Sequence, residues 1–369
     1  MTGVRHAVVV THTRLRLGGT VVSDTVDRLC EAGFEVKVID NLEPPAFDVQ
    51  PAVIDDDTEI VVVLGGDGTI LRAAELVRCT RTPILGVNMG HVGFLAEFES
   101  FQMDEAIRRI AERDYSIDER MIAHVDVWLP GAAKPIENWA LNDITLERAD
   151  RGKMVELSIC VDDVEMSSFG ADGVIVSTPT GSTAYAFSAG GPIMWPNVKA
   201  LQLVPLAAHA LFARPLVIGA GSTFTINILD DSMSDGWICC DGRRQRALPK
   251  GTRVDVRASR GTLRLARLSG APFTERLVTK FDLPVVGWRE QAAHGANPNR
   301  ESAASRDYRS SYADHSDYHH RDGERRPDRG LHVGHVCDDV DVTDDEVDDL
   351  IGGGKASASP RRTAEGERR

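Results

Sequence analysis

The sequence predicts an α/β N-terminal domain with a mainly parallel sheet, then a mostly β domain and a disordered C-terminal tail. In residues 1–114, short apolar runs alternate with helical patterns, an order that is typical of a mainly parallel sheet. In residues 115–268, runs of alternating polarity follow one another between turn pairs such as Pro130-Gly131. Residues 291–330 contain no Leu, Ile, Val, Met, Phe or Trp, so this stretch cannot bury enough surface to offset its ordering entropy.

The elements of the first domain follow from hydrophobic period and from turn residues. β-Branched apolar runs predict strands at residues 6–10, 34–39, 59–64 and 83–87. Apolar residues at helical spacing predict helices at residues 21–32, 69–77 and 100–112. Gly33 ends the first of these helices, and the prolines and acidic residues of 41–57 predict a loop.

The second domain is predicted from shorter strands. They lie at residues 123–129, 139–146, 155–161, 173–178, 223–229, 253–258 and 262–268. Asp241-Gly242 predicts a hairpin turn between strands at 237–240 and 243–246. Residues 272–281 return to a helical pattern, and we expect the segment 269–290 to pack back toward the first domain. Residues 291–369 form the predicted disordered tail.

Composition excludes several classes of protein. The net charge of −14 over 369 residues argues against a nucleic-acid-binding face, which needs clustered positive charge. None of the six cysteines forms a C-x-x-C pair, so we expect no metal site built from them. No apolar run reaches membrane-spanning length, and the N-terminus has no signal-peptide pattern. We therefore expect no nucleic acid or membrane among the partners, and a cytoplasmic location.

The central motif is Gly65-Gly66-Asp67-Gly68-Thr69, between a predicted buried strand and a predicted helix. Glycines allow a ligand to approach the backbone, and a helix N-terminus offers free N–H groups that suit phosphate. Ligands of open α/β sheets bind at the carboxyl ends of strands, which is where this turn lies. The alternative is that Asp67 only caps the helix, although a polar cap needs at most one glycine and three flank this residue.

Two further stretches carry unusual polar residues. The segment from Thr178 to Ser188 is long, uncharged and rich in hydroxyl groups, and Tyr185 adds a stacking face, so it suits a ribose and a base. A plain surface loop is the alternative. Asn142 and Asp143 interrupt an otherwise apolar strand, so their polar groups need partners or water. An ordinary β-bulge is the alternative there.

Together these motifs closely resemble the NAD kinase family over roughly residues 5–290. Gly65-Gly-Asp-Gly-Thr69, Asn142-Asp143 and Thr178-Pro-Thr-Gly-Ser-Thr-Ala-Tyr185 match the signature motifs of that family in order and spacing. Asn88-Met-Gly-His-Val-Gly-Phe-Leu95 and Arg214-Pro215 match too. A GGDG turn alone is weak, because lipid kinases and phosphofructokinases share it, whereas the Thr178–Tyr185 block makes the resemblance specific.

The resemblance implies transfer of the γ-phosphoryl group of ATP, or of a polyphosphate, to the 2′-hydroxyl of the adenosine ribose of NAD. It implies Asp67 as the catalytic base and magnesium as the divalent metal that accompanies ATP. The residues that would line the phosphates are Gly65, Gly66, Gly68 and Thr69. The residues that would bind NAD are Asp67, Gly68, Arg72, Phe94, Asn142, Asp143, Lys153, Asp172, Thr183, Ala184, Tyr185, Ala186, Phe187 and Ser188. The family also implies a homodimer or homotetramer.

Two other functions compete with this one. Another kinase of the GGDG type would act on a lipid or a sugar, but the motifs include no large apolar acceptor pocket. A catalytically silent NAD-binding sensor would act through the tail, but Asp67 is intact.

Overall fold

The computed structural model describes residues 4–11, 20–40, 45–49, 54–89, 93–99, 102–210, 213–268, 270 and 272–283. The predicted tail, 291–369, lies outside these residues, as does most of the Pro-rich part of the predicted loop at 41–57. Within the described residues, no helix is long and apolar enough to cross a membrane.

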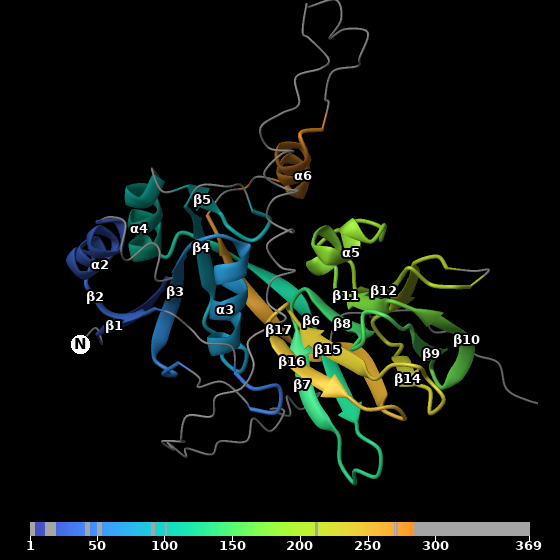
Figure 1. Ribbon diagram of the computed structural model, residues 1–369. Coiled ribbons are helices and arrows are strands. Elements are labelled where there is room, and N and C mark those ends of the chain that lie inside the picture. The colour runs from blue at the N-terminus through green and yellow to red at the C-terminus, as the bar shows by residue number, and fades with distance from the viewer. Residues whose placement is uncertain are drawn as a thin grey trace, which may run out of the picture. The chain divides into compact units, whose positions relative to one another are not determined.

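The N-terminal half is a parallel sheet covered on both faces (Figure 1). Its strands are β1 (Arg5–Val10), β2 (Phe34–Ile39), β3 (Thr58–Leu64) and β4 (Ile84–Asn88), in the order β4-β3-β1-β2. Its helices are α2 (Val21–Glu31), α3 (Asp67–Val77) and α4 (Met103–Glu112). Alternate side chains along each strand face opposite ways. Ile60 and Val62 therefore pack toward α2 and α4, while Val61 and Val63 pack against α3.

The C-terminal half consists of antiparallel strands in two packed layers. One layer holds β6 (Ser116–Trp128), β7 (Ile136–Ala140), β9 (Val155–Val161), β10 (Val164–Ala171), β14 (Phe224–Ile228) and β17 (Arg253–Arg267). The other holds β8 (Asp143–Arg148), β11 (Gly173–Ser177), β12 (Ala200–Leu206), β13 (Leu216–Gly219), β15 (Gly236–Cys240) and β16 (Arg244–Leu248). A single apolar core lies between the two layers.

Strand β17 joins the two halves into one sheet. It pairs with β6 and β14 along its first part, and near its end Leu265 pairs with Ile84 of β4 in the parallel direction. The sheet order β10-β9-β14-β17-β4-β3-β1-β2 therefore runs from one half into the other. The sequence predicted two strands here, at 253–258 and 262–268. The structure has one strand with an irregularity between Ala258 and Thr262.

Most predicted elements are present, with differences that have physical causes. The Asp241-Gly242 hairpin is confirmed, because both residues have positive φ, at 52° and 66°, between the antiparallel strands β15 and β16. Strand β12 was missed because it contains Pro205, a residue that usually argues against a strand. The edge strand β10 was missed because most of it is exposed and polar, and the two-residue strand β5 (Phe98–Glu99) is too short to show a pattern.

The last described element is helix α6 (Phe273–Phe281), which matches the helix predicted at 272–281. Its side chains contact residues 94–97, which follow β4 in the N-terminal half. They also contact Phe187 in the short helix α5 (Tyr185–Ser188) of the C-terminal half.

Candidate functional site

The Gly65–Thr69 turn joins the buried end of β3 to the first turn of α3. A Cβ on Gly65 would lie 2.4 Å from Thr69 Oγ1, so only glycine fits against the threonine. A Cβ on Gly66 or Gly68 would meet nothing within 4 Å, so open space lies in front of these two residues. The N–H groups of Thr69 and Ile70 both donate to the Gly66 carbonyl, which leaves those of Asp67 and Gly68 at the open helix end.

The Asp67 carboxylate does not cap the helix. Gly66 is the N-cap residue and Asp67 is the first residue inside the helix, two positions before the predicted start at 69. Its Oδ2 accepts the Phe94 N–H at 2.9 Å and its Oδ1 accepts the Leu95 N–H at 3.0 Å. The predicted alternative of a helix cap is therefore wrong. The carboxylate binds the segment that follows β4, and a Cβ on Gly93 would lie 2.3 Å from Oδ1.

Asn142 and Asp143 lie where the chain passes from one sheet layer to the other. The predicted single strand 139–146 is instead β7, a bend at residues 141–142, and β8, so the prediction of one continuous strand is wrong. The buried Asp241 carboxylate accepts the N–H groups of Leu141, Asn142 and Asp143 at 3.0, 2.7 and 3.4 Å. The break is thus a specific turn tied to a carboxylate, and it differs from a simple β-bulge.

Asp143 and Asp241 form a buried acidic pair with unequal surroundings. Asp241 also accepts from Arg244 Nη2 at 2.9 Å, so it has the donors that an ionised carboxylate requires. Burial, followed by the negative charges of Asp241 and Glu147, raises the pKa of Asp143 to about 8. Burial raises the pKa of Asp241 as well, but Arg244 and the three backbone N–H donors oppose that shift, so we expect Asp143 to be the member of the pair that holds a proton at neutral pH when no ligand is present.

The loop from Thr178 to Thr183 packs directly on this turn. The Thr178 N–H donates to the Asn142 carbonyl at 2.9 Å and its hydroxyl donates to the Leu141 carbonyl. A Cβ on Gly181 would lie 2.0 Å from the Asn142 carbonyl oxygen, so this contact requires glycine. The alternative of a plain surface loop is wrong for these residues, since nearly all of residues 178–183 are buried.

Tyr185, two residues after this loop, lies near Asp143 of the acidic pair. Burial, followed by the charges of Glu147, Asp143 and Asp172, raises the pKa of Tyr185 to about 12, which shows that the ring lies near these carboxylates. Asp172 is itself paired with Arg148 at 3.2 Å. The predicted site residues Asn142, Asp143, Asp172, Thr183 and Tyr185 therefore lie in one region of the C-terminal half.

Aromatic rings connect Phe94 to Phe187, which are both predicted to bind NAD. The ring of Phe281 in α6 lies 5.7 Å from that of Phe94 and 4.6 Å from that of Phe187, between centroids. Phe273 lies 5.9 Å from Phe94 and 5.3 Å from Trp195. Sequence reasoning missed α6 as part of this region, although Phe273, Leu277 and Phe281 recur at helical spacing.

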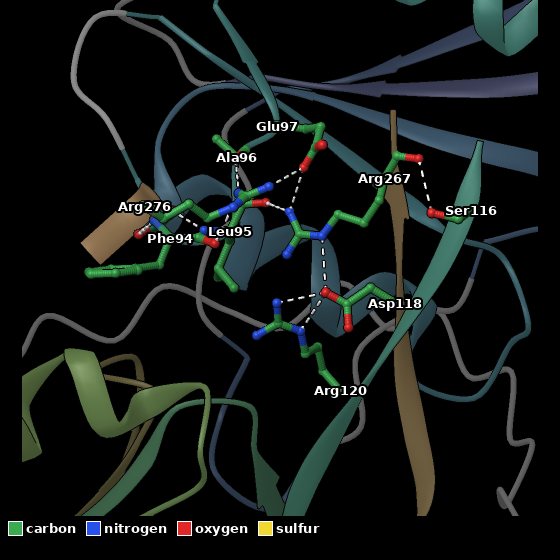
Figure 2. Close-up of polar contacts among 10 residues, drawn as sticks. Phe94, Leu95, Ala96, Glu97, Ser116, Asp118, Arg120, Arg267 and Arg276 are labelled. Atoms are coloured by element: carbon green, nitrogen blue, oxygen red, sulfur yellow. Dashed lines mark hydrogen bonds and ion pairs between the residues drawn. The ribbon is translucent and has the colours of Figure 1, made fainter. Parts of the chain in front are cut away.

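Figure 2 shows a network of ion pairs and hydrogen bonds that runs from residues 94–97 to Arg120. Arg267 and Arg276 both bind Glu97 and backbone carbonyls of residues 94–96. Arg267 also pairs with Asp118, which pairs in turn with Arg120. Arg120 Nη1 donates to Thr180 Oγ1 at 3.4 Å, so the network reaches the Thr178–Thr183 loop. None of these arginines was predicted from the sequence, because each lies far along the chain from the motif that it contacts.

Two further predicted site residues are Lys153 and Arg72. Lys153 is exposed and pairs with Asp150 at 3.4 Å in the turn between β8 and β9. Arg72 is part of α3 and half-buried. Their predicted contacts with NAD stay predictions, as do those of the other site residues.

A cavity of about 580 Å³ lies at the opposite end of β3 from the glycine turn. Thr58 and Glu59 line it, together with Arg81 and Arg264. Glu59 is already paired with Arg5 and Arg113, and these pairs lower its pKa to about 2. Because ligands of parallel sheets bind at the carboxyl ends of the strands, this cavity is separate from the candidate site.

Comparisons with known proteins agree with the geometry. The ATP-NAD kinase N-terminal domain model matches residues 22–115, and the ATP-NAD kinase C-terminal domain model matches residues 141–268. An NAD kinase of Bifidobacterium longum subsp. infantis is 83% identical over 293 residues, which are 79% of this chain and 87% of that protein. An NAD kinase of Thermobifida fusca is 47% identical over 295 residues, covering 79% and 88% of the two chains.

Solved structures show the same fold. A yeast NADH kinase complexed with NADH superposes with a TM-score of 0.67 at 22% identity, covering 78% of this chain and 90% of that one. An NAD kinase from Archaeoglobus fulgidus in complex with ATP superposes with a TM-score of 0.56 at 26% identity, covering 70% and 92%. With two matched domain models and close relatives along most of their length, the chain belongs to the NAD kinase family.

Proposed function

We propose that this protein transfers the γ-phosphoryl group of ATP to the 2′-hydroxyl of the adenosine ribose of NAD, at the region that Asp67, the Asn142–Asp143 turn and the Thr178–Thr183 loop surround. The observation that carries this proposal is 83% identity to an NAD kinase over 293 residues. A lipid or sugar kinase of the GGDG type and a silent NAD sensor are not favoured, since relatives that match along most of the chain are NAD kinases.

Asp67 is the proposed base for the ribose hydroxyl. A secondary hydroxyl is a poor nucleophile, and a positioned carboxylate that accepts its proton contributes about 10²–10⁴-fold in rate. The open space before Gly66 and Gly68 supports a phosphate against the N–H groups of the helix start, together with Gly65 and Thr69. Phosphoryl transfer needs positioning and charge stabilisation more than covalent help, and both are available at this turn.

The C-terminal half is proposed to hold NAD. Asn142, Thr183 and Ala184 are assigned to the adenine and Asp143 to the ribose hydroxyls. Asp172, Tyr185 and Ser188 are assigned to the nicotinamide end, with Ala186 and Phe187 between them. Phe94, Arg72, Lys153 and Gly68 complete the proposed contacts. A protonated Asp143 can donate a hydrogen bond to one ribose hydroxyl, whereas an ionised one can only accept.

Magnesium is proposed to arrive as the complex with ATP. Among the described residues, no group of three or more His, Cys, Asp or Glu side chains could hold a metal ion. Mg²⁺ in kinases is bound by substrate phosphates plus one or two carboxylates, so a dedicated protein cage is unnecessary. We also propose a cytoplasmic homodimer or homotetramer, and polyphosphate as a second donor.

The test is a coupled assay. Purified protein is incubated with NAD, ATP and magnesium, and the product is detected with a dehydrogenase specific for NADP. Formation of NADP that needs both NAD and ATP supports the proposal. Binding of NAD in calorimetry with no NADP formed would identify a sensor instead. Parallel reactions with polyphosphate test the second donor.

A further inference from the structure

We propose that Arg276 in α6 is a positioning residue for Asp67 and acts through the backbone of Phe94, Leu95 and Ala96. The inference rests on the proposed catalytic role of Asp67. It adds a residue that lies 209 positions further along the chain and belongs to none of the signature motifs.

One side of the segment faces Asp67. Both carboxylate oxygens accept an N–H group, from Phe94 at 2.9 Å and from Leu95 at 3.0 Å. Two hydrogen bonds from two successive peptide groups fix the plane of the carboxylate. They also fix the direction in which its remaining lone pairs can accept a further hydrogen bond. The position of the base therefore depends on the position of two peptide groups.

The other side of the same peptide strip faces two guanidinium groups (Figure 2). Arg276 Nη1 donates to the Ala96 carbonyl at 2.6 Å and to the Phe94 carbonyl at 3.4 Å. Arg267 Nη1 donates to the Leu95 carbonyl at 3.1 Å. The strip from Phe94 to Ala96 is thus held by its N–H groups on Asp67 and by its carbonyl groups on the two arginines.

A buried charge keeps both arginines in place. Glu97 Oε2 accepts from Arg267 and from Arg276, and its side chain is fully buried. Charge-assisted hydrogen bonds of this kind are about twice as strong as neutral ones. Asp118 adds a second carboxylate on Arg267 at 3.0 Å. We call this set of residues the clamp: Arg267, Arg276, Glu97 and Asp118. It is a network of ion pairs in which a carboxylate orients each arginine.

Arg276 is the last residue of the clamp along the chain, and it lies on α6 outside the large sheet. Arg267 belongs to β17 in the middle of the large sheet, so many backbone bonds fix it. Arg276 belongs to α6, whose rings Phe273 and Phe281 also pack on Phe94. Helix α6 therefore holds the segment by its backbone carbonyls and by the Phe94 side chain.

The experiment is a double-mutant cycle on turnover number. Arg276→Gln, Asp67→Asn and the double variant are compared with the original chain in the coupled assay at saturating NAD and ATP. A displacement near 1 Å costs about 10²-fold in rate, so we expect Arg276→Gln to lower kcat by about 10- to 100-fold. In the Asp67→Asn background the same substitution should change kcat by no more than about 2-fold, because there is no base left to position.

Two further variants separate positioning from loss of structure. Arg276→Lys keeps the charge beside Glu97 but cannot reach two carbonyls as a planar guanidinium does, so we expect reduced kcat with an unchanged melting temperature. Arg108→Gln is the matched control, because Arg108 is likewise a helical arginine paired with glutamate, here Glu105 and Glu112, but lies exposed on α4. It should leave kcat within about 2-fold of the original chain.

The outcomes are distinct. Equal fold losses from Arg276→Gln in both backgrounds would show that Arg276 does not act through Asp67, and unchanged turnover in both Arg276 variants would overturn the inference as well. Normal turnover in Asp67→Asn alone would remove the proposed base, and this failure is visible before any Arg276 variant is measured.

Discussion

Replacing Asp143 by Asn should change how the stability of the protein depends on pH. The Asp143 carboxyl is buried beside Asp241 and Glu147, and its pKa is raised from 3.8 to about 8. Below pH 3.8 the carboxyl is protonated in the folded and the unfolded protein alike. Between that value and about pH 8, the unfolded chain releases the proton while the folded protein keeps it, so the free energy of unfolding falls as pH rises.

The size of the effect follows from the two pKa values. Each pH unit between them is worth about 1.4 kcal/mol, so the whole interval of about four units is worth at most about 6 kcal/mol. Asn has nearly the same shape and does not ionise. We therefore expect the variant and the original chain to be similarly stable near pH 4, and the variant to be more stable by up to a few kcal/mol at pH 8.

The assay is urea unfolding at a series of pH values from about 4.5 to about 8.5, followed by tryptophan fluorescence. Saturating NAD should be absent, because a ligand on Asp143 would change its proton affinity. The difference between the two proteins, taken at each pH, removes the contribution of all other titrating groups. Parallel curves for the two proteins would mean that Asp143 is ionised in the fold, and the assignment of the proton within the pair would be wrong.

Four further outcomes are expected. Asp67→Asn should lower turnover by about 10²–10⁴-fold, and normal turnover would show that Asp67 is not the base. The same variant should have a lower melting temperature, because the single amide oxygen of Asn can accept only one of the two N–H groups of Phe94 and Leu95. Asp143→Ala should raise the Michaelis constant for NAD much more than that for ATP, whereas equal effects would argue for a purely structural turn. Gly181→Ala should destabilise the protein by about 1–3 kcal/mol in urea unfolding, since its Cβ would meet the Asn142 carbonyl; an unaffected variant would show that the loop can move away. Ending the chain after Glu290 should leave turnover and melting temperature nearly unchanged, and a large loss of either would show that the tail docks on the fold.

Individual strands, helices and turns could be predicted because hydrophobic periodicity and turn residues determine them. The strand, turn and helix around Asp67 and the Asp241-Gly242 hairpin both follow from residues that are neighbours along the chain, at 58–77 and at 236–248. The helix cap was a wrong alternative for Asp67 because the partner of the carboxylate is a tertiary contact, at Phe94 and Leu95. Local pattern contains no signal for such a partner.

The non-local parts of the site were not predictable for the same reason. Asp241 was read as a turn residue, yet its carboxylate also holds the backbone of residues 141–143. The strand break at residues 141–142 looked like two polar residues in one strand, because the apolar residues 139–141 and Ile144 stand on either side of it and only the sheets of β7 and β8 differ. Arg276 lies in a half-buried position on an amphipathic helix, where an arginine is ordinary.

The pairing of β17 with β4 has a consequence for biosynthesis. The ribosome synthesises the chain from the N-terminus, so β4 cannot pair with β17 until Leu265 has been made. Contacts between residues so far apart in sequence form slowly, and until they do, the N-terminal half exposes the edge of β4 that β17 covers in the complete fold. The contacts of Arg276 with the Phe94–Ala96 backbone form later still, because Arg276 is synthesised after the whole of β17. A nascent or truncated chain that ends before α6 therefore carries every signature motif but lacks Arg276 on the Phe94–Ala96 backbone. If Arg276 positions Asp67 as proposed, we expect activity only once the whole folded region has been made.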